Sequence, residues 1–318
     1  MIGIVTSGGD APGMNAAIRA VTRVACSKGF SVVGFERGWD GLLNNTYRKL
    51  TPRSVGGIIQ LGGTILHTLR CPAFEEPGGV ERAAETLSLH DVDGLVVIGG
   101  DGSFRGALDL SRVSEALMIG VPATIDNDVF GTDETIGFDT AVNTAVGAID
   151  KIRDTAISHE RIFIVEVMGR KRGFLALEVG ICAGAEVISI PEKPITLDSL
   201  MKVMEANSKK GKRAGVIVVA EGVGDTSKLA KEIQMQTESE VRLSILGYAQ
   251  RGGSPTARSR FLASLFAEKA VELIVSGEGN RAVGLQNGEI GSVDLKKAAK
   301  GYKPINLRLL HVADMLAT

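Results

Sequence analysis

Short runs of β-branched and aliphatic residues recur along this chain, and segments with apolar residues at helical spacing separate them. Strands are predicted at Ile2–Thr6, Ser31–Phe35, Gly94–Ile98, Leu117–Val121, Arg161–Val167, Glu186–Ile190, Gly215–Ala220 and Ser244–Gly247. Helices are predicted at Ala16–Lys28, Val80–Leu89, Thr140–Ile152, Leu197–Lys209 and Arg260–Val275. Because most of the strand runs are apolar throughout, both faces of each strand are expected to be covered, which is typical of parallel sheets.

Alternation of strands and helices over the whole length predicts a doubly wound α/β architecture. The number of predicted strands exceeds what one open sheet comfortably holds, so we expect two sheets and two domains. A chain of 318 residues has the length for this arrangement. The change in sequence character after a long loop rich in Gly and Asp places the first domain boundary near residue 138.

Composition and charge exclude several classes of function. The formal net charge is −1 and aromatic residues make up 4%, which disfavours nucleic acids and anionic membranes as partners. The three cysteines, Cys26, Cys71 and Cys182, are sparse and unpatterned, which favours reduced thiols over a disulfide framework. We recognise no signal peptide and no apolar run of membrane-spanning length, so a cytoplasmic protein is expected.

Glycine-rich loops follow two of the predicted strands, at Gly8–Asn15 and Gly99–Ser103. Ligands of open α/β sheets bind beyond the carboxyl ends of the strands, where glycines let the backbone approach a phosphate. Asp101 lies in the second loop and is a candidate Mg²⁺ ligand, because this cation prefers oxygen donors. The alternatives are a tight turn that needs glycine for geometry alone and an aspartate that caps a helix.

A third loop, Pro122–Asp128, carries two carboxylates. One of them can accept a proton from a substrate hydroxyl while the other supports a metal through water; a polar surface turn is the alternative. Two arginines, Arg170 and Arg251, also follow predicted strands, and arginine pairs with phosphate oxygens in bidentate fashion. An ordinary surface arginine or a glycine-rich turn remains possible at these two positions.

A second group of basic residues suggests another anion site. Arg19 and Arg23 are four residues apart and share a helix face, and Arg153 and the Lys209–Arg213 cluster are candidates to join them. Taken singly, each is better explained as solvated surface charge. Neither the lysine-containing phosphate loop nor the dinucleotide-binding glycine fingerprint is present, which disfavours an NAD-linked dehydrogenase.

Taken together, these segments resemble the bacterial ATP-dependent 6-phosphofructokinase family. The matching strings are TSGGDAPGMNAAIR, IGGDGS, TIDND, GTDETIGFDTA, VEVMGR and QRGGSP, and they occur in family order over nearly the whole chain. The resemblance implies Mg²⁺-dependent transfer of the ATP γ-phosphoryl group to the 1-hydroxyl of fructose 6-phosphate, and a homotetramer regulated by ADP and phosphoenolpyruvate. It also implies two similar, mainly parallel α/β domains: an ATP-binding domain of residues 1–137 plus about 251–300, and a sugar-phosphate-binding domain of 138–250 plus about 301–318.

The resemblance also implies roles for individual residues. Asp126 is the expected general base, with Arg170 and Thr124 as further catalytic residues, and Asp101 and Asp128 are the expected supports of Mg²⁺. The implied ATP site contains Gly9, Arg70, Cys71, Gly100, Asp101, Gly102 and Ser103. The implied sugar-phosphate site contains Thr124, Ile125, Asp126, Met168, Gly169, Arg170, Glu221, Tyr248 and Arg251, and, from a neighbouring subunit, Arg161 and Arg242. The implied effector site contains Arg19, Arg23, Arg153, Lys210, Lys212 and Arg213.

Several positions depart from the family's usual pattern. Tyr248 stands where a histidine is usual, and Ala123 stands where ATP users commonly have Gly and pyrophosphate users commonly have Lys. Gly102 matches the ATP users, since pyrophosphate users usually carry an Asp there. ATP is therefore the expected donor, with a pyrophosphate-dependent or mixed-donor enzyme as the alternative. The stretch Thr51–Gly57 lacks the family's usual pattern and leaves regulation open. A regulatory subunit without catalysis is disfavoured, because a pure binder needs no base.

Overall fold

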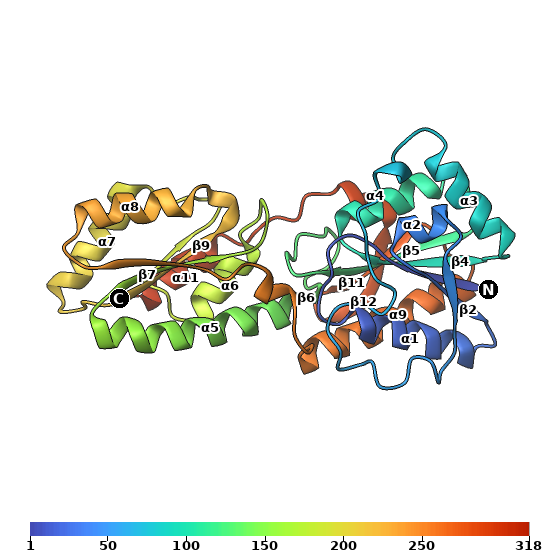
Figure 1. The fold of residues 1–318 in the computed structure, drawn as a ribbon, viewed down its shortest axis with the longest axis horizontal. Helices are drawn as coiled ribbons and strands as arrows, with labels where there is room; N and C mark the ends of the chain where they lie inside the picture. Colours follow the sequence, from blue (N-terminus) through green and yellow to red (C-terminus); the bar gives the residue numbers. More distant parts are fainter. Residues whose placement is uncertain (318) are drawn as a thin grey trace. The chain divides into compact units, whose positions relative to one another are not determined.

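The computed structural model describes residues 1–317, which divide into two α/β units (Figure 1). Unit 1 comprises residues 1–140 and 251–303, and unit 2 comprises residues 141–250 and the chain from residue 304 onward. The chain leaves unit 1 within a long helix and returns to it at Arg251, so each unit is built from two separate segments. The assignment of an ATP-binding and a sugar-phosphate-binding role to these parts stays a prediction.

The sheet of unit 1 has eight strands, in the order β12-β11-β5-β4-β1-β2-β3, with β6 paired to β5. The strands are β1 (Ile2–Thr6), β2 (Val32–Phe35), β3 (Tyr47–Leu50), β4 (Gly94–Gly99), β5 (Leu117–Thr124), β6 (Ile136–Gly137), β11 (Arg281–Gln286) and β12 (Glu289–Asp294). Only the two edge strands, β3 and β12, pair in antiparallel fashion. Every residue of β1 and β4 is buried, as expected for parallel strands covered on both faces.

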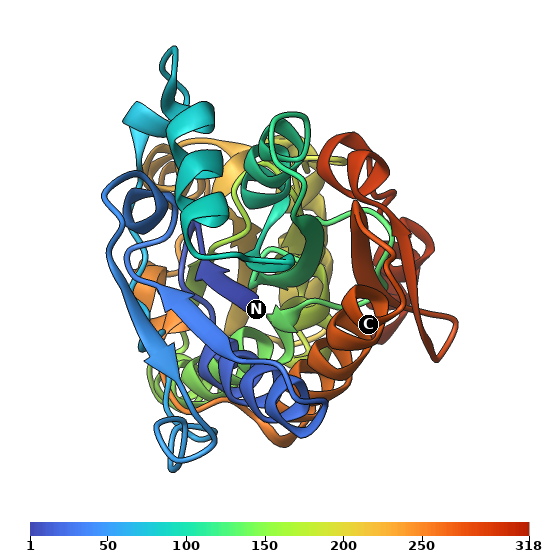
Figure 2. The ribbon, with the colours of Figure 1, turned by 90° about the vertical axis from the view of Figure 1, so that its right-hand side faces the viewer.

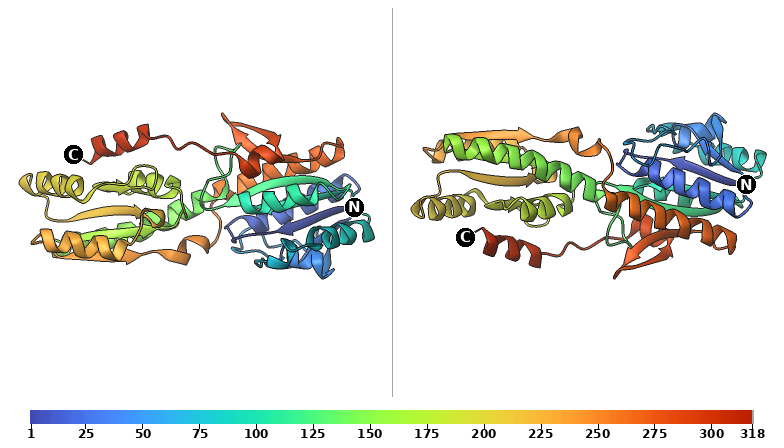
Figure 3. Two further views of the ribbon diagram at one scale, coloured as in Figure 1. Left: turned by 90° about the horizontal axis from the view of Figure 1, so that it is seen from above. Right: turned by 90° about the horizontal axis from the view of Figure 1, so that it is seen from below.

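Helices cover both faces of this sheet (Figure 2). On one face α1 (Met14–Ser27) and α9 (Ala257–Val275) lie side by side, as Figure 3 shows from below. The other face carries α2 (Trp39–Leu43), the short η1 (Pro72–Phe74), α3 (Gly79–Leu89), α4 (Asp101–Leu110) and α10 (Leu295–Lys300). A continuous core fills this second face, with Phe35, Trp39 and Phe104 among its largest side chains. The two covered faces fix the direction in which the strand-end loops emerge.

Unit 2 contains a four-stranded, fully parallel sheet in the order β10-β7-β9-β8. Its strands are β7 (Ile162–Val167), β8 (Val187–Ser189), β9 (Gly215–Ala220) and β10 (Val241–Ile245). The remaining elements are α5 (Phe138–His159), α6 (Phe174–Cys182), α7 (Leu197–Lys209), η2 (Glu221–Val223), α8 (Thr226–Gln236), η3 (Gly247–Arg251) and α11 (Arg308–Leu316). Leu200 of α7 and Ile233 of α8 join the strands in one buried cluster, so both helices cover the same face. Within residues 1–317, no helix combines the length and apolar character that crossing a bilayer requires.

The predicted α/β fold with mainly parallel sheets is confirmed, but several elements differ from the sequence-based expectation. The strand predicted at Ser244–Gly247 is wrong by about three residues, since β10 spans Val241–Ile245. No residue of β10 is fully buried, so its apolar signal is diluted by exposed positions. The edge strand β3 went unpredicted because three of its four residues are exposed. Helix α4 starts inside the loop motif at Asp101, where glycines hid the helical pattern.

A matched pair of leucines on α3 tests the core of unit 1. Leu87 is 1% exposed and Leu89 is 68% exposed. We expect Leu87→Ala to lower the free energy of unfolding by about 2–5 kcal/mol, because it leaves a cavity, and Leu89→Ala to change it by less than about 0.5 kcal/mol. Trp39 is the only tryptophan of the chain and stacks on Phe74 in unit 1 at 4.6 Å. Its fluorescence during urea unfolding therefore reports the unfolding of unit 1. Equal losses of unfolding free energy in the two variants would contradict the assignment of Leu87 to the core and Leu89 to the surface.

Candidate functional site

Three loops meet at one edge of the sheet of unit 1. Strands β1, β4 and β5 are adjacent and parallel, and Thr6, Ile98 and Val121 lie at the same level of the sheet. The residues that follow these strands carry the Gly8–Asn15 motif, the Gly99–Ser103 motif and the Asp-Asn-Asp motif. The parallel pairing thus brings Asp101 and Asp126 to the same edge of the sheet rather than to opposite sides of it.

The first two loops are joined by close backbone contacts. The Ser103 hydroxyl donates to the carbonyl oxygen of Ser7 at 2.9 Å, and the Ser7 N–H donates to the carbonyl oxygen of Ile98 at 3.0 Å. A Cβ atom on Gly99 would lie 2.5 Å from the Ser7 carbonyl oxygen, so no side chain fits there. Glycine at this position allows the close approach of the two loops.

Asp101 is the first residue of α4, and the N-cap position belongs to Gly100. The alternative reading of Asp101 as a helix cap is therefore wrong. One carboxylate oxygen, Oδ1, accepts from the Gly102 N–H at 2.7 Å, and Oδ2 accepts from Nη1 of Arg105 at 2.6 Å. Arg105 was missed in the sequence analysis, although its spacing of four residues from Asp101 on a helix was a usable signal. The pair partly neutralises Asp101 and orients it.

The loop with Asp101 contacts the loop with Asp126 directly. A Cβ atom on Gly100 would lie 3.7 Å from the Cβ atom of Thr124. Thr124 in turn holds the turn that follows it: its hydroxyl accepts from the Asp126 N–H at 3.2 Å, and its carbonyl accepts from the Thr135 hydroxyl at 2.6 Å. Asp126 itself is 4% exposed. The predicted base is thus fixed by its neighbours rather than free on a flexible loop.

Arg251 and the predicted nucleotide residues also lie in unit 1. Arg251, predicted to clamp a sugar phosphate, forms an ion pair with Asp10 at 2.6 Å, and a Cβ atom on Gly9 would lie 2.7 Å from its Nη2 atom. Arg70 is exposed and Cys71 is half-buried just before η1. Burial raises the pKa of the Cys71 thiol, so this group is a neutral thiol near pH 7. Arg251 therefore contacts the glycine-rich loop after β1, at Gly9 and Asp10.

In unit 2 a second set of predicted residues gathers at the carboxyl edge of the sheet. Met168, Gly169 and Arg170 follow β7, and Glu221 follows the neighbouring strand β9. Glu221 Oε1 accepts from the Gly169 N–H at 3.1 Å and from the Arg170 N–H at 2.6 Å. Gly169 and Arg170 both have positive φ angles, of 136° and 52°. Glu221 thereby holds an unusual backbone turn that sets the direction of Arg170.

Two further predicted arginines share one carboxylate. Arg161 directly precedes β7, and Arg242 is the second residue of β10. Both form ion pairs with Glu240. The hydrogen bond from Arg161 is the largest cause that lowers the pKa of the Glu240 carboxyl. Tyr248, in η3, is 77% exposed. Arg161 and Arg242 are therefore already gathered by one acid in the single chain, which keeps both side chains close to each other.

The predicted effector residues are distributed over both units. Arg19 and Arg23 lie on α1 in unit 1, and Arg23 donates to the carbonyl oxygen of Pro52 at 3.4 Å. The others belong to unit 2, where Arg153 donates to the carbonyl oxygens of Ala183 and Gly184 at 2.7 and 2.8 Å. Lys210 is exposed, Lys212 donates to the carbonyl oxygen of Ala317, and Arg213 pairs with Glu160. An effector role for the set stays a prediction.

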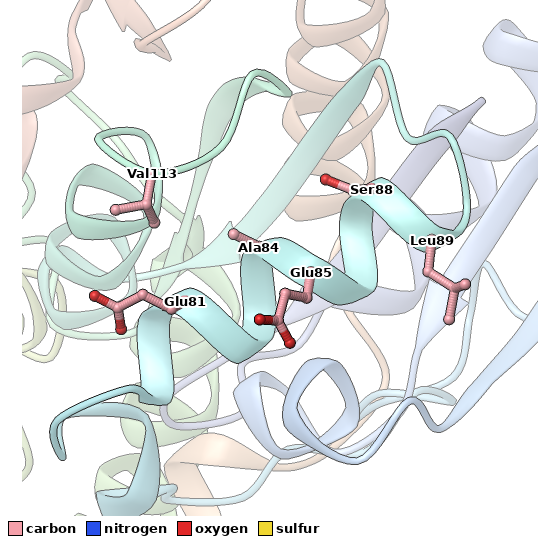
Figure 4. Close-up of a pocket in the computed structure, with 6 residues that line it drawn as sticks. All are labelled: Glu81, Ala84, Glu85, Ser88, Leu89 and Val113. Atoms are coloured by element: carbon pink, nitrogen blue, oxygen red, sulfur yellow. The ribbon is translucent and has the colours of Figure 1, made fainter.

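A depression on the surface of unit 1 runs along α3 (Figure 4). None of the predicted site residues lines it; the lining residues are Glu81, Ala84, Glu85, Ser88, Leu89 and Val113. Its two glutamates disfavour an anionic ligand. Among residues 1–317 there is also no cluster of three His, Cys, Asp or Glu side chains that would hold a metal ion by itself.

Fold and loops together define a doubly wound α/β protein with glycine-rich, acidic loops at its strand ends. A family model described as "Phosphofructokinase" matches residues 1–274. The ATP-dependent 6-phosphofructokinase of Clostridium botulinum is 50% identical over 316 residues, covering 99% of both chains. The ATP-dependent 6-phosphofructokinase 1 of Thermus thermophilus is 50% identical over 318 residues, again covering 99% of both.

Solved structures agree with these matches. Phosphofructokinase of Pichia pastoris in the T-state superposes with a TM-score of 0.88 at 34% identity, covering 98% of this chain and 36% of that one. This chain thus spans only a little over a third of the Pichia protein. A pyrophosphate-dependent phosphofructokinase from Marinobacter aquaeolei has a TM-score of 0.85 at 23% identity, covering 96% of this chain and 86% of that one, and shows the fold alone. This chain belongs to the phosphofructokinase family, which confirms the resemblance read from its motifs.

Proposed function

We propose that this protein transfers the γ-phosphoryl group of ATP to the 1-hydroxyl of fructose 6-phosphate, giving fructose 1,6-bisphosphate and ADP. The observation that carries the proposal is the contact between the loops after β4 and β5, which brings Asp101 and Asp126 to one edge of a sheet. Two bacterial relatives at 50% identity over their full length carry the name ATP-dependent 6-phosphofructokinase. Their full-length coverage supports the same reaction here, as a step of glycolysis.

Asp126 acts as the general base of this reaction. It takes the proton of the 1-hydroxyl while that oxygen bonds to the γ-phosphorus and the bond to the leaving oxygen of ADP breaks. The hydrogen bond between the Thr124 hydroxyl and the Asp126 N–H supports its orientation. Arg170 offers a planar cation for the charge that develops on the transferred group. Alignment and charge neutralisation contribute most of the rate in such transfers.

Mg²⁺ is proposed as the metal cofactor, with Asp101 and Asp128 as its supports. A cation held mainly by the phosphates of ATP fits this chain, because Mg²⁺ sites commonly use only one or two carboxylates plus phosphate oxygens and water. Asp101 is about one-third exposed, and each carboxylate oxygen retains a lone pair beyond its single hydrogen bond. When bound, the ion supplies positive charge to the phosphate oxygens.

Further residues complete the proposed binding sites. Unit 1 is the proposed ATP-binding part, with Gly9, Arg70, Cys71, Gly100, Gly102 and Ser103, and unit 2 is the proposed sugar-phosphate-binding part. The residues proposed to bind the sugar phosphate are Thr124, Ile125, Met168, Gly169, Glu221, Tyr248 and Arg251, and Arg161 and Arg242 from a neighbouring copy of the chain. We propose a homotetramer, as the resemblance to the family implies, and the assignment of Arg161 and Arg242 to a neighbouring subunit rests on it.

Replacing the proposed base tests the mechanism. We expect Asp126→Ser to lower kcat by about 10²–10⁴-fold, the usual contribution of one positioned base, while KM for fructose 6-phosphate changes much less. The exposed Asp109 provides the matched control, and Asp109→Ser is expected to keep wild-type kinetics. A coupled steady-state assay measures both constants. An Asp126→Ser variant that retains most of its turnover would show that another group takes the proton.

The phosphoryl donor is tested by comparing ATP with pyrophosphate at saturating fructose 6-phosphate. We expect activity with ATP, because Gly102 leaves room beside the loop: a Cβ atom there would meet only Arg105, at 3.5 Å. Gly102→Asp is expected to impair ATP use by adding a negative charge near the phosphates. Ala123 provides no cation for pyrophosphate. Activity with pyrophosphate alone would favour the alternative, a pyrophosphate-dependent enzyme.

Regulation is proposed at Arg19, Arg23, Arg153, Lys210, Lys212 and Arg213, with ADP as activator and phosphoenolpyruvate as inhibitor. Titration of each compound against the fructose 6-phosphate saturation curve is expected to shift its midpoint, because both anions match this basic set. Light scattering on the same samples is expected to give the mass of four chains. An unchanged curve with both compounds removes the regulatory assignment, and a monomer removes the assignment of Arg161 and Arg242 to a neighbouring subunit.

A further inference from the structure

The Asp-Asn-Asp turn is held by its central residue. Asn127 is 5% exposed and has a φ angle of 51°, in the left-handed region that asparagine tolerates better than most residues. Its Oδ1 accepts from the Thr135 N–H at 3.1 Å, and its Nδ2 donates to the carbonyl oxygen of Asp133 at 3.2 Å. The side chain of Asn127 therefore closes the loop of residues 127–135 on itself and sets the directions of its two flanking aspartates, Asp126 and Asp128.

A lysine from far along the chain fastens this closed loop. Lys303 Nζ donates to Asn127 Oδ1 at 2.8 Å and to the carbonyl oxygen of Asp133 at 3.0 Å. These two acceptors lie at the two ends of the Asn127–Asp133 bridge, so one ammonium group joins both sides of the loop. A hydrogen bond from a charged donor is stronger than one between neutral groups. The half-buried position of Lys303 reduces the competition from water.

The backbone just before Lys303 is itself fixed against the same loop. A Cβ atom on Gly301 would lie 2.6 Å from Cγ of Phe130, so the segment packs on the loop too closely for any side chain. The Gly301 N–H also donates to the carbonyl oxygen of Lys297 at 2.7 Å, at the end of α10. Lys303 thus reaches Asn127 from a rigid support, and its ammonium group acts as a fixed point rather than as a mobile surface charge.

The same segment also touches the other acidic loop. Arg105, the partner of Asp101, donates to the carbonyl oxygen of Ala299 at 3.5 Å, and α10 packs on α4. Residues 299–303 are therefore in contact with both the side chain that orients Asp101 and the turn that carries Asp126.

We propose that Lys303 is a positioning residue for the reaction: through Asn127 it holds the turn that aims Asp126 at the acceptor hydroxyl. The inference rests on the proposed role of Asp126 and adds a residue that none of the recognised motifs contains. Its effect falls on the chemical step, because a base displaced by about 1 Å can lose about 10²-fold in rate while substrate binding is preserved. Lys303 does not touch the reacting atoms in this account.

The test replaces Lys303 by Met, which keeps much of its length and removes its charge and donors. We expect kcat to fall by about 10–100-fold with KM values for both substrates changed by less than about threefold. Lys303→Arg, which keeps a charged donor, is expected to restore most of the turnover. The exposed Lys300, three residues earlier, provides the control, and Lys300→Met is expected to leave kcat and KM unchanged.

A double-mutant cycle separates positioning from a general loss of stability. Asn127→Gly keeps the left-handed turn and removes the acceptor of Lys303. In that background Lys303→Met is expected to lower kcat by less than about threefold, since the two side chains act through one contact. Independent, multiplying effects would overturn the proposal, as would a Lys303→Met variant with wild-type kcat or with a raised KM alone.

Amide hydrogen exchange of residues 125–135 gives a readout without substrate, and it also serves if Lys303→Met proves too unstable for kinetics. In that case Lys303→Arg and Lys303→Gln take the place of Lys303→Met. Amide exchange of residues 125–135 is expected to be as slow as in the wild type in the Arg variant and faster in the Gln variant. Equal exchange in both overturns the proposal. If the wild-type protein fails to phosphorylate fructose 6-phosphate, the proposed function is wrong. Slow amide exchange that depends on Lys303 would then still show that this residue holds the loop of residues 127–135.

Discussion

The parallel pairing of β4 with β1 on one side and β5 on the other determines where the acidic and glycine-rich loops of unit 1 lie. Thr6, Ile98 and Val121 lie at the same level of the sheet, so the loops that follow the three strands emerge at the same edge. The loops are then joined by short contacts, such as the hydrogen bond from Ser103 to Ser7. Without this shared edge, residues separated by about a hundred positions along the chain would have no reason to act together.

Both units use a buried or half-buried side chain to hold a left-handed turn next to a proposed reactive residue. In unit 1 Asn127 closes the turn between two aspartates, and in unit 2 Glu221 accepts the N–H groups of Gly169 and Arg170. Residues in this backbone region are costly and persist only where their surroundings compensate. The compensation comes from side chains that carry out no chemistry themselves, which explains why the loops combine unusual geometry with fixed orientation.

Much of this arrangement was predictable from the sequence, because β-branched runs followed by Gly-Gly-Asp or Asp-Asn-Asp combine a periodic signal with a chemical one. The segments predicted as strands before Asp101 and Asp126, Gly94–Ile98 and Leu117–Val121, contain only apolar residues and glycine, so both strands could be placed directly before their loops. Arg105 and Lys303 were not predicted, since a single basic residue carries no periodic signal and its partner is defined only by the folded chain. For Lys303 the partner Asn127 lies 176 residues away. Edge strands such as β3 were missed for a related reason, because exposure removes the apolar pattern.

Each unit is assembled from two stretches of chain, and this has a consequence for the order in which the protein can fold during synthesis. The partner of α1 in the packed layer below the sheet is α9, which follows the whole of residues 141–250. A nascent chain therefore exposes the apolar side of α1 and the edge of β5 until α9 and β11 leave the ribosome. Residues 141–250, the longer segment of unit 2, are synthesised before α9 and β11, so unit 1 is completed only after most of unit 2 has been made.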